Sequence, residues 1–271
     1  MTVKLYDGDF QTCARKGRFV LEEKGVPYER VTVDDVMEIA DPDGWFRKIS
    51  PKGQVPVLEH DGRTTHESNV IAEYVNEVFD GPALLPSDHW ERVLARRWML
   101  RLTLDIHDFV HLPINFACTY VPYFQEQGEE AIQKFIRSST PIRQLVLPDL
   151  FEKRFESEFF RGPVRAYDRV FDDMERQLAH TQYLAGDAFS LAEVGTVPYA
   201  YRILVELGLG PDLFARQRPR LVDWVQRNAE RDGFKRAFVV PGIEQMIERL
   251  RQGAGEARPY VEEILAAGTP I

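Results

Sequence analysis

The sequence predicts a small α/β domain followed by an all-helical domain. Over the first eighty residues, short runs with the alternation of strands take turns with helical patterns. Apolar residues at 70–79 recur at the spacing of one face of an amphipathic helix, and strand-like patterns nearly vanish after the proline- and glycine-rich break at 80–88. We therefore place an α/β domain at residues 1–80, a linker at 81–90 and an all-helical domain at 91–271.

Local signals place each element of the first domain. Gly25 is typical of the residue just past a helix end, and Ser68 suits the N-cap of the helix that carries the apolar face. In chain order we expect a strand at 3–6, a helix at 13–24 with Phe19, Val20 and Leu21 facing inward, a strand at 28–33, a short helical stretch around 45–46, a hairpin of 55–59 and 63–66, and a helix over 70–79.

The second domain shows helical spacing almost throughout. Leu94, Trp98 and Leu102 begin a series with intervals of three and four residues that marks a long helix. Residues 141–163 contain three prolines and many aromatic residues, and they receive no assignment. Further helices are expected at 129–136, 165–178, 191–207 and 221–230.

Composition excludes several classes of protein. The 271 residues carry a net charge of −9, from 34 Lys and Arg against 43 Asp and Glu, which argues against a nucleic-acid partner. The apolar runs are far shorter than the roughly 20 residues that span a bilayer, and the start of the chain lacks a secretory pattern. Two cysteines cannot form a disulfide framework, which is typical of a protein of the reducing cytoplasm. We therefore expect a cytoplasmic protein, and the short apolar runs predict no membrane partner.

Cys13 is the first candidate for chemistry. It lies at the predicted first turn of a helix, after Thr12, where the helix dipole and free N–H groups favour a thiolate. Arg15, Lys16 and Arg18 add positive charge nearby. An inert, partly buried thiol explains the same position equally well. No second cysteine follows within the turn, so any thiol chemistry needs an external thiol.

Two residue pairs further along suit a peptide-like ligand. Pro56 stands at a strand entrance, where a cis bond would expose the backbone of Val55 to a ligand's peptide group, although a trans proline fits the sequence as well. Glu67 and Ser68 stand at a helix start, where free N–H groups bind carboxylates. Helix capping alone would also explain Ser68.

Taken together, these segments have a recognisable order. Gln54-Val-Pro-Val-Leu58 followed by Glu67-Ser-Asn-Val-Ile-Ala-Glu-Tyr74 resembles the glutathione-binding signature of the cytosolic glutathione transferase family. The resemblance implies a thioredoxin-like N-terminal domain, an all-α C-terminal domain and a homodimer. It extends to Leu84–Pro86, to Tyr183–Glu193 with the capping box Ser190-x-x-Glu193, where the family usually has Asp, and to Pro219–Trp224.

The resemblance implies a glutathione site on the first domain, with glutathione as cosubstrate. Val55, ahead of a cis Pro56, would pair with the cysteinyl backbone of glutathione. The side chains implied around the rest of the tripeptide are Glu67 and Ser68, which would hold the γ-glutamyl amine and carboxylate, and Lys52 and Gln54, which would lie nearby.

Cys13 falls at the activating position, as in the cysteine-type members of the family. A donor there would stabilise the thiolate of glutathione, or Cys13 would itself form a mixed disulfide with glutathione. Thr12 is a rival activator, because its hydroxyl could take this role if Cys13 points inward. Tyr6 ends the first strand, where tyrosine-type members keep their donor, but packing in the strand is the favoured explanation.

The second substrate is expected between the domains, against the long helix. Residues 107–124 of this helix are unusually aromatic, which suits an apolar, aromatic electrophile. The candidate contacts are His107, His111, Asn115 and Tyr120, and core or dimer packing is the alternative for each. His107 and His111 are four residues apart but have no further ligand at metal-binding spacing, so we expect no metal. Cys118 is expected to be a buried small hydrophobe.

These observations predict a cysteine-type glutathione transferase that acts on small hydrophobic, aromatic compounds, as in detoxification. Trp45–Pro56 and Pro141–Phe160 are also similar to bacterial β-aryl etherases. Those enzymes carry Ser or Asn-Ser near position 13, where this chain has Thr12-Cys13, so the etherase function is not favoured. The alternative function is that of a glutathione-dependent etherase, a glutathione lyase or a reductive dehalogenase. A non-catalytic interaction module with the same fold is the alternative from another class.

Overall fold

The computed structural model describes residues 2–33 and 43–268, so the outer limits predicted at residues 1 and 271 lie outside the described residues. The chain packs into two compact units. The first unit comprises Met1–Leu100, Thr181–Pro198 and Trp224–Ile243, and the second comprises Arg101–His180, Tyr199–Asp223 and Glu244–Ile271. This division follows packing rather than chain order, and the domain limits at 80 and 90 stay a prediction.

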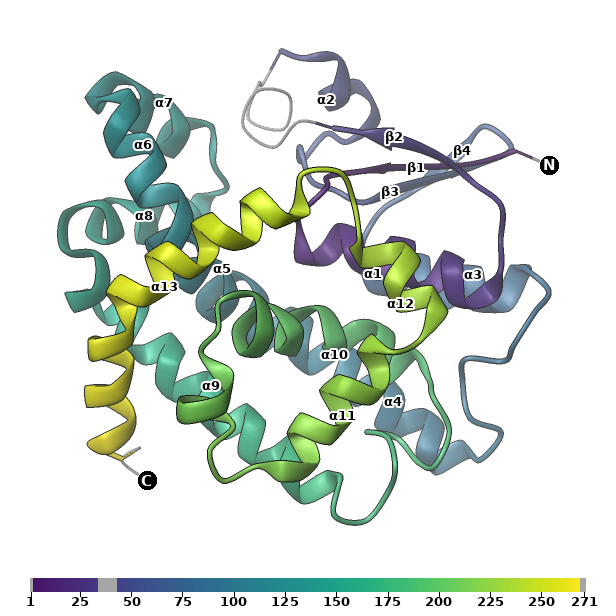
Figure 1. The fold of residues 1–271 in the computed structure, drawn as a ribbon. Helices are drawn as coiled ribbons and strands as arrows, with labels where there is room; N and C mark the ends of the chain where they lie inside the picture. Colours follow the sequence, from purple (N-terminus) through teal and green to yellow (C-terminus); the bar gives the residue numbers. More distant parts are fainter. Residues whose placement is uncertain (1, 34–42, 269–271) are drawn as a thin grey trace. The chain divides into compact units, whose positions relative to one another are not determined.

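A four-stranded mixed sheet with the strand order β2-β1-β3-β4 forms the centre of the first unit (Figure 1). Strand β1 (Val3–Asp7) runs parallel to β2 (Glu29–Thr32) and antiparallel to β3 (Val57–His60). Strand β4 (Arg63–Thr65) completes the predicted hairpin with β3. The predicted α/β fold of this part of the chain is confirmed.

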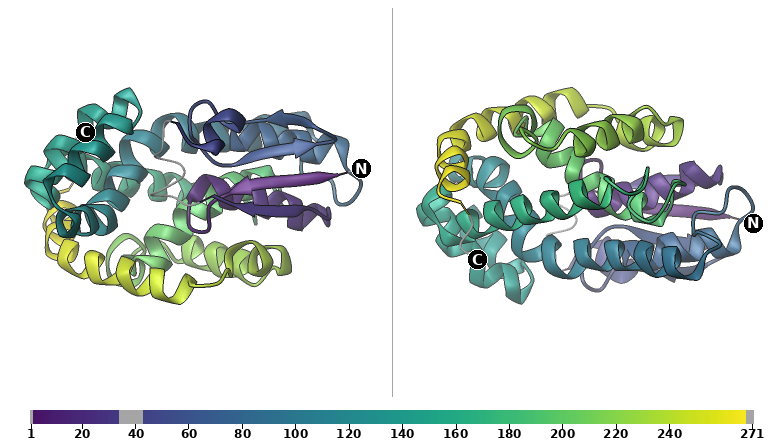
Figure 2. Two further views of the ribbon diagram at one scale, coloured as in Figure 1. Left: turned by 90° about the horizontal axis from the view of Figure 1, so that it is seen from above. Right: turned by 90° about the horizontal axis from the view of Figure 1, so that it is seen from below.

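Three helices cover the two faces of this sheet. Helices α1 (Thr12–Lys24) and α3 (Ser68–Val78) lie side by side on one face, and α2 (Trp45–Ile49) lies on the other (Figures 1 and 2). Phe19, Val20 and Leu21 of α1 are completely buried, as expected, and Gly25 ends the helix with a φ of 69°.

Tyr6 belongs to the core on the α2 side of the sheet. It packs there with Val33, Phe46 and Val57, and its hydroxyl donates to Glu59 Oε2 at 2.9 Å. The interpretation of Tyr6 as a packed strand residue is consistent with these contacts.

Helix α12 (Asp232–Phe238) was not expected from the sequence, and it packs against α1. The rings of Phe234 and Phe238 meet Phe19 edge-to-face at 6.0 and 5.8 Å. A seven-residue helix shows less than two turns of periodicity, so its pattern is too short to recognise in the sequence.

The predicted capping box begins α10 (Leu191–Tyr201). Glu193 Oε2 accepts from the backbone N–H and the hydroxyl of Ser190, both at 3.0 Å, and Ser190 Oγ accepts from Ala192 N at 3.1 Å. Burial raises the pKa of the Glu193 carboxyl, while the hydrogen bonds from Leu184, Ser190 and Trp224 oppose that rise.

The remainder is helical, as predicted. The long helix starts as α4 (His89–Arg101) and continues to Gln127 through two π-helical segments, Leu102–His111 and Phe116–Tyr120. The other helices along it and after it are α5 (Leu112–Asn115), α6 (Val121–Gln127), α7 (Glu129–Ser138), α8 (Pro141–Lys153), α9 (Glu158–Gln177), α11 (Pro219–Ala229) and α13 (Ile243–Ala266). None of the described helices is long and apolar enough to cross a membrane.

The unassigned stretch 141–163 is helical too. Pro141 begins α8, where the N–H that proline lacks has no partner to lose, while Pro148 and Pro163 lie inside α8 and α9. Packing in the bundle therefore overrides the sequence signal that proline gives against a helix.

Candidate active site

Cys13 occupies the second position of α1, and its side chain is partly exposed. Thr12, the first residue of the helix, is buried with 6% of its surface exposed. The residue before them, Gln11, is extended, and the first turn contains no acidic residue. The free N–H groups at this end of the helix favour a negative charge, so a thiolate is favoured at Cys13.

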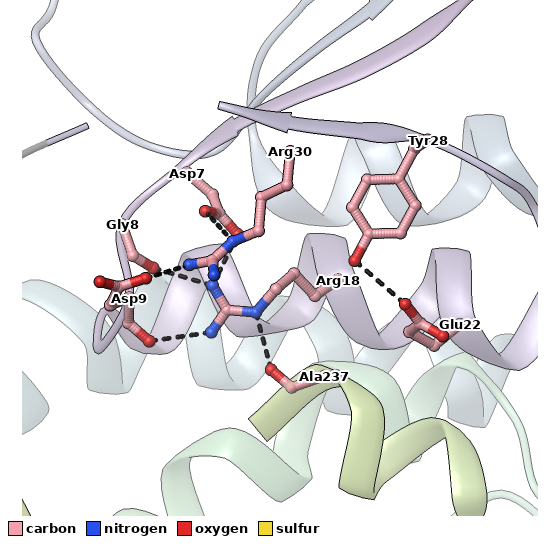
Figure 3. A network of polar contacts seen from close by, with 8 residues as sticks. All are labelled: Asp7, Gly8, Asp9, Arg18, Glu22, Tyr28, Arg30 and Ala237. Carbon is pink, nitrogen blue, oxygen red and sulfur yellow. Dashed lines mark hydrogen bonds and ion pairs between the residues drawn. The ribbon is translucent and has the colours of Figure 1, made fainter. Parts of the chain in front are cut away.

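The loop that leads from β1 to Cys13 is held by Arg18, which has only 1% of its surface exposed (Figure 3). The guanidinium donates to Asp7 Oδ2 at 2.6 Å, to the carbonyls of Gly8 and Asp9 at 2.9 Å each, and to the Ala237 carbonyl of α12 at 2.7 Å. The sequence indicates only that Arg18 adds positive charge near the thiol. In the structure Asp7 pairs with this arginine, which holds the loop.

A second arginine closes the same network. Arg30 on β2 donates to Asp7 Oδ1 at 2.8 Å and also pairs with Asp9. Burial raises the pKa of the Asp7 carboxyl, and the charges of Arg18 and Arg30 oppose that rise. Two cations against one buried carboxylate fix the end of β1, and thereby the start of α1 (Figure 3).

Lys16 lies one helical turn after Cys13 and is completely buried. Its Nζ donates to Asn69 Oδ1 at 3.2 Å. Burial lowers the pKa of Lys16, while the negative charges of Cys13 and Glu67 oppose that fall. In the sequence Lys16 is one of three basic residues that follow Cys13. Only its helical spacing from Phe19 and Val20 pointed to the buried face of α1.

The peptide bond between Val55 and Pro56 is cis, as the resemblance implied. Gly17 brings α1 directly against this proline, since a Cβ at Gly17 would lie 3.3 Å from Pro56 Cβ. The preceding turn is closed by Ser50, whose Oγ accepts from Gln54 N at 3.0 Å and donates to Gln54 O at 2.9 Å. The start of α1 and the Val55 backbone thus belong to one packed region. Ser50 was not expected from the sequence.

Glu67 and Ser68 begin α3, with one correction. The N-cap is Glu67, with a φ of 66°, and Ser68 is the first helical residue, so the prediction of Ser68 as N-cap was wrong by one position. The sequence does not show which of Glu67 and Ser68 is the N-cap, because the positive φ of Glu67 cannot be predicted from it. Glu67 Oε1 lies 3.1 Å from Lys52 Nζ. The negative charge of Glu67 also raises the pKa of Lys16.

The proposed substrate residues all belong to the second unit. His111 is buried, and its Nδ1 lies 2.6 Å from the hydroxyl of Tyr167. His107 Nδ1 lies 3.1 Å from the hydroxyl of Tyr199, and the two imidazoles stack with centroids 6.4 Å apart, as residues on one helix face. Both histidines lie in the π-helical segment Leu102–His111, and such segments are frequent at functional sites.

Asn115 and Tyr120 make contacts of a different kind from the imidazole pair. Asn115 Nδ2 donates to the His111 carbonyl at 2.7 Å, and the ring of Tyr120 packs against Phe116 and Phe135. Over the described ranges 2–33 and 43–268, no group of three or more His, Cys, Asp and Glu side chains could hold a metal ion.

Comparison with known proteins decides the family. Models of the N-terminal and C-terminal domains of glutathione S-transferase match residues 12–78 and 164–227. The chain belongs to the glutathione transferase family. It is a glutathione-using, transferase-like enzyme, and glutathione is its cosubstrate.

Individual relatives of this glutathione transferase span nearly its whole length. Protein LigF of Sphingobium sp. is 28% identical over 93% of this chain and 99% of its own. The crystal structure of that protein, described as a beta-etherase, matches with a TM-score of 0.76 over 88% of this chain and 99% of its own. Glutathione transferase F7 of Populus trichocarpa matches with a TM-score of 0.63 at 27% identity, over 87% of this chain and 97% of its own.

Within this glutathione transferase, the structure separates the predicted residues into two groups. Cys13, Thr12 and Val55 share the first unit with the pair of Lys52 and Glu67, and His107 and its neighbours lie in the second. The buried Lys16 and the loop-holding Arg18 are additional members of the first group. Both side chains are buried by residues distant in the sequence, so no local motif indicates what they contact.

Proposed function

We propose that this glutathione transferase is a cysteine-type enzyme acting on small hydrophobic, aromatic compounds. The observation that carries the proposal is the partly exposed thiol of Cys13 at the start of α1, with Thr12 buried beside it. The thiol either stabilises the thiolate of glutathione or exchanges with it.

Glutathione binds on the first unit in this proposal. The backbone of Val55, ahead of the cis Pro56, pairs with the cysteinyl residue of the tripeptide, and the γ-glutamyl end binds at Glu67 and Ser68. The ion pair between Lys52 and Glu67 supports this placement, because it combines a cation for a carboxylate with a carboxylate for an amine. Gln54, whose backbone is hydrogen-bonded by Ser50, lies beside glutathione in this proposal.

Two reactions follow from a thiolate at this position. In conjugation, the glutathione thiolate attacks an electrophilic carbon, the C–S bond forms, and the leaving group departs with its electron pair and takes up a proton. In exchange, the Cys13 thiolate attacks the glutathionyl sulfur of a mixed disulfide and releases the other thiolate; a second glutathione thiolate then regenerates Cys13 and forms glutathione disulfide.

Two substitutions of Cys13 separate these reactions. Cys13→Ala is expected to reduce conjugation by about 10²-fold, the typical effect of losing one donor to a developing anion, and to abolish disulfide reduction, for which the sulfur is the nucleophile. Cys13→Ser keeps a hydroxyl donor, so it should retain conjugation and lose exchange. Cys118→Ala is the matched control and should leave both unchanged, because Cys118 is buried. Full activity of Cys13→Ala in both assays would make Thr12 the catalytic group.

Ether cleavage is a second candidate function, favoured by the likeness to LigF, which is described as a beta-etherase. In this reaction the C–S bond to glutathione forms as the aryl ether C–O bond breaks, and the phenolate leaves. Release of a phenol from a β-aryl ether, measured with and without glutathione, tests this candidate. No phenol from a panel of such ethers would exclude it while leaving the conjugation assays above unaffected.

The hydrophobic substrate contacts the second unit in this proposal, at His107, His111, Asn115 and Tyr120. The π-helical segment and its imidazole pair support this placement. His107→Gln is expected to raise KM for the aromatic substrate and to leave KM for glutathione unchanged. An equal rise in both would contradict the assignment.

The enzyme is further proposed to be a cytoplasmic homodimer, as the family resemblance implies. The apolar side chains exposed on α3 and α4, such as Val70, Trp90 and Val93, support a dimer contact there. Light scattering on the purified protein measures its mass directly, and a mass equal to that of one chain at micromolar concentration would refute the dimer.

A further inference from the structure

Lys16 lies on the same face of α1 as Cys13, one turn further along the helix. The whole side chain is buried, with 0% of its surface exposed. An ammonium group without water is unfavourable unless negative charges lie close to it. The groups around Lys16 therefore decide whether the site carries a positive charge.

One hydrogen-bond partner of Lys16, Asn69, is neutral and fixed in place. Asn69 accepts from Nζ at 3.2 Å through Oδ1, and its Nδ2 donates to the Met99 carbonyl at 2.9 Å. This second bond orients the amide with its oxygen toward the lysine. Asn69 thereby positions Nζ but contributes no charge.

Two negative groups face Lys16, one from each helix at the site. These are Cys13 on α1, when its thiol is ionised, and the carboxylate of Glu67 at the start of α3; a negative charge on either raises the pKa of Lys16 and favours the ammonium form. Glu67 is shared, because Lys52 also pairs with it at 3.1 Å.

The charged groups of α12, on another side of α1, are engaged elsewhere. Arg231 pairs with Glu23 at 2.6 Å, and Arg236 pairs with Glu22 at 2.6 Å. Their charges are compensated at the far end of α1. Arg15, another buried cation near Cys13 on α1, lies over the ring of Phe238 at 4.9 Å from its centroid.

We infer that Lys16 is a positioning residue that holds a thiolate at the start of α1, and that Glu67 competes with this thiolate for the buried ammonium. The inference rests on the proposed function in one respect, the binding of the glutathione amine at Glu67. That amine neutralises the carboxylate, so Lys16 then acts on the thiolate alone. Binding of the γ-glutamyl end thereby makes the thiol at Cys13 more acidic.

The pH dependence of Cys13 alkylation tests this inference. All variants carry Cys118→Ala, so that iodoacetamide reports on a single thiol. Lys16→Met removes the charge and keeps an unbranched side chain, and it is expected to raise the midpoint of the rate–pH profile by about one unit, a roughly tenfold slower reaction at neutral pH. If Lys16→Met does not fold, Lys16→Gln, which keeps a donor for Asn69, makes the same comparison.

Lys24→Met is the matched control, since Lys24 is a second buried lysine of the same helix. Its Nζ donates to the carbonyls of Asn76 and Pro82, away from the thiol. The midpoint should not move in this variant. An unchanged midpoint in Lys16→Met, or an equal shift in Lys24→Met, would overturn the inference.

A double-mutant cycle isolates the competition with Glu67. Glu67→Gln is expected to lower the midpoint when Lys16 is present and to lower it less in the Lys16→Met background. S-methylglutathione, which carries the amine but no free thiol, should lower the midpoint of the parent and not that of Glu67→Gln. Equal effects in both backgrounds would contradict the shared ammonium.

The outcome is distinguishable from that of the proposed function. Alkylation reports the charge of Cys13 whether or not the thiol takes part in turnover. A loss of catalysis in Cys13→Ala with no midpoint shift in Lys16→Met would leave the proposed function standing and refute the role of Lys16.

Discussion

The two cysteines of the chain occupy opposite environments. Cys13 is partly exposed at a helix start, and a buried lysine lies one turn away. Cys118 has 2% of its surface exposed inside the π-helical segment Phe116–Tyr120, where burial raises the pKa of its thiol to about 12. The charge of Arg154 lies near Cys118, but Glu256 pairs with this arginine. A nearby cation therefore does not suffice, and what separates the thiols is position at a helix end and access to water.

Differential alkylation of the native protein gives the largest expected effect. At pH 7.5 a thiol with a pKa of about 12 has roughly 10³-fold less thiolate than an ordinary one near 8.5, before its burial slows the reaction further. One thiol per native chain should react with iodoacetamide, and mass spectrometry should place the label on Cys13. Cys13→Ser should remain unlabelled until it is denatured. Rapid labelling of Cys118 in the folded chain would break the comparison.

The loop before Cys13 depends on buried charge, whereas Cys118 depends on packing. Asp7→Asn leaves Arg18 buried without its carboxylate, so the free energy of unfolding should fall by about 3–5 kcal/mol. Asp9→Asn is the matched control, because Asp9 is partly exposed and should cost about 1 kcal/mol or less. Urea unfolding measures both. A loss below about 1 kcal/mol for Asp7→Asn would show that the network does not hold the loop.

Much of the candidate site lies in local segments that the sequence alone indicates. Val55, Pro56 and Glu67 stand in a motif of fixed order, and Cys13 stands at a helix start that its neighbours define. The role of Lys16 was not predictable, because its burial depends on α3, which is more than fifty positions away in the sequence. The same holds for Arg18, whose partner Ala237 belongs to a helix near the end of the first unit.

The fold follows a similar rule. Helices with several turns of periodicity were predicted to within a few residues, as α3 and α11 show, whereas α9 begins seven residues before its predicted start. The prolines at 141–163 prevented an assignment from the sequence, whereas in the structure packing stabilises helices around Pro148 and Pro163. The short α12 was not predicted, because its aromatic residues are buried by a contact with Phe19, which is distant in the sequence.

Packing around Cys118 is sensitive to one methyl group. A Cβ at Gly253 of α13 would lie 1.7 Å from the Cys118 carbonyl oxygen, so Gly253→Ala should destabilise the protein by about 1–3 kcal/mol. Gly255 has open space around it in the same helix, and Gly255→Ala should add up to about 1 kcal/mol. Thermal unfolding measures the pair. Gly253→Ala should also speed labelling of Cys118 and leave the rate at Cys13 unchanged, and equal stability of the two variants would contradict the close contact.

The last prediction concerns the pH dependence of stability that the buried lysine confers. The pKa of Lys16 is lowered in the folded protein, so between that value and about 10.4 the unfolded chain binds more protons than the folded one. The free energy of unfolding therefore rises with pH across this window, by at most about 1.4 kcal/mol per pH unit for one proton. Lys16→Met lacks this rise, so its stability relative to the wild type should fall as the pH increases from 7 to 10 in urea titrations. Removing the thiol charge by Cys13→Ser lets the pKa of Lys16 fall further, which widens the window. A relative stability that is independent of pH, or a window unchanged by Cys13→Ser, would show that Lys16 does not share its charge with Cys13.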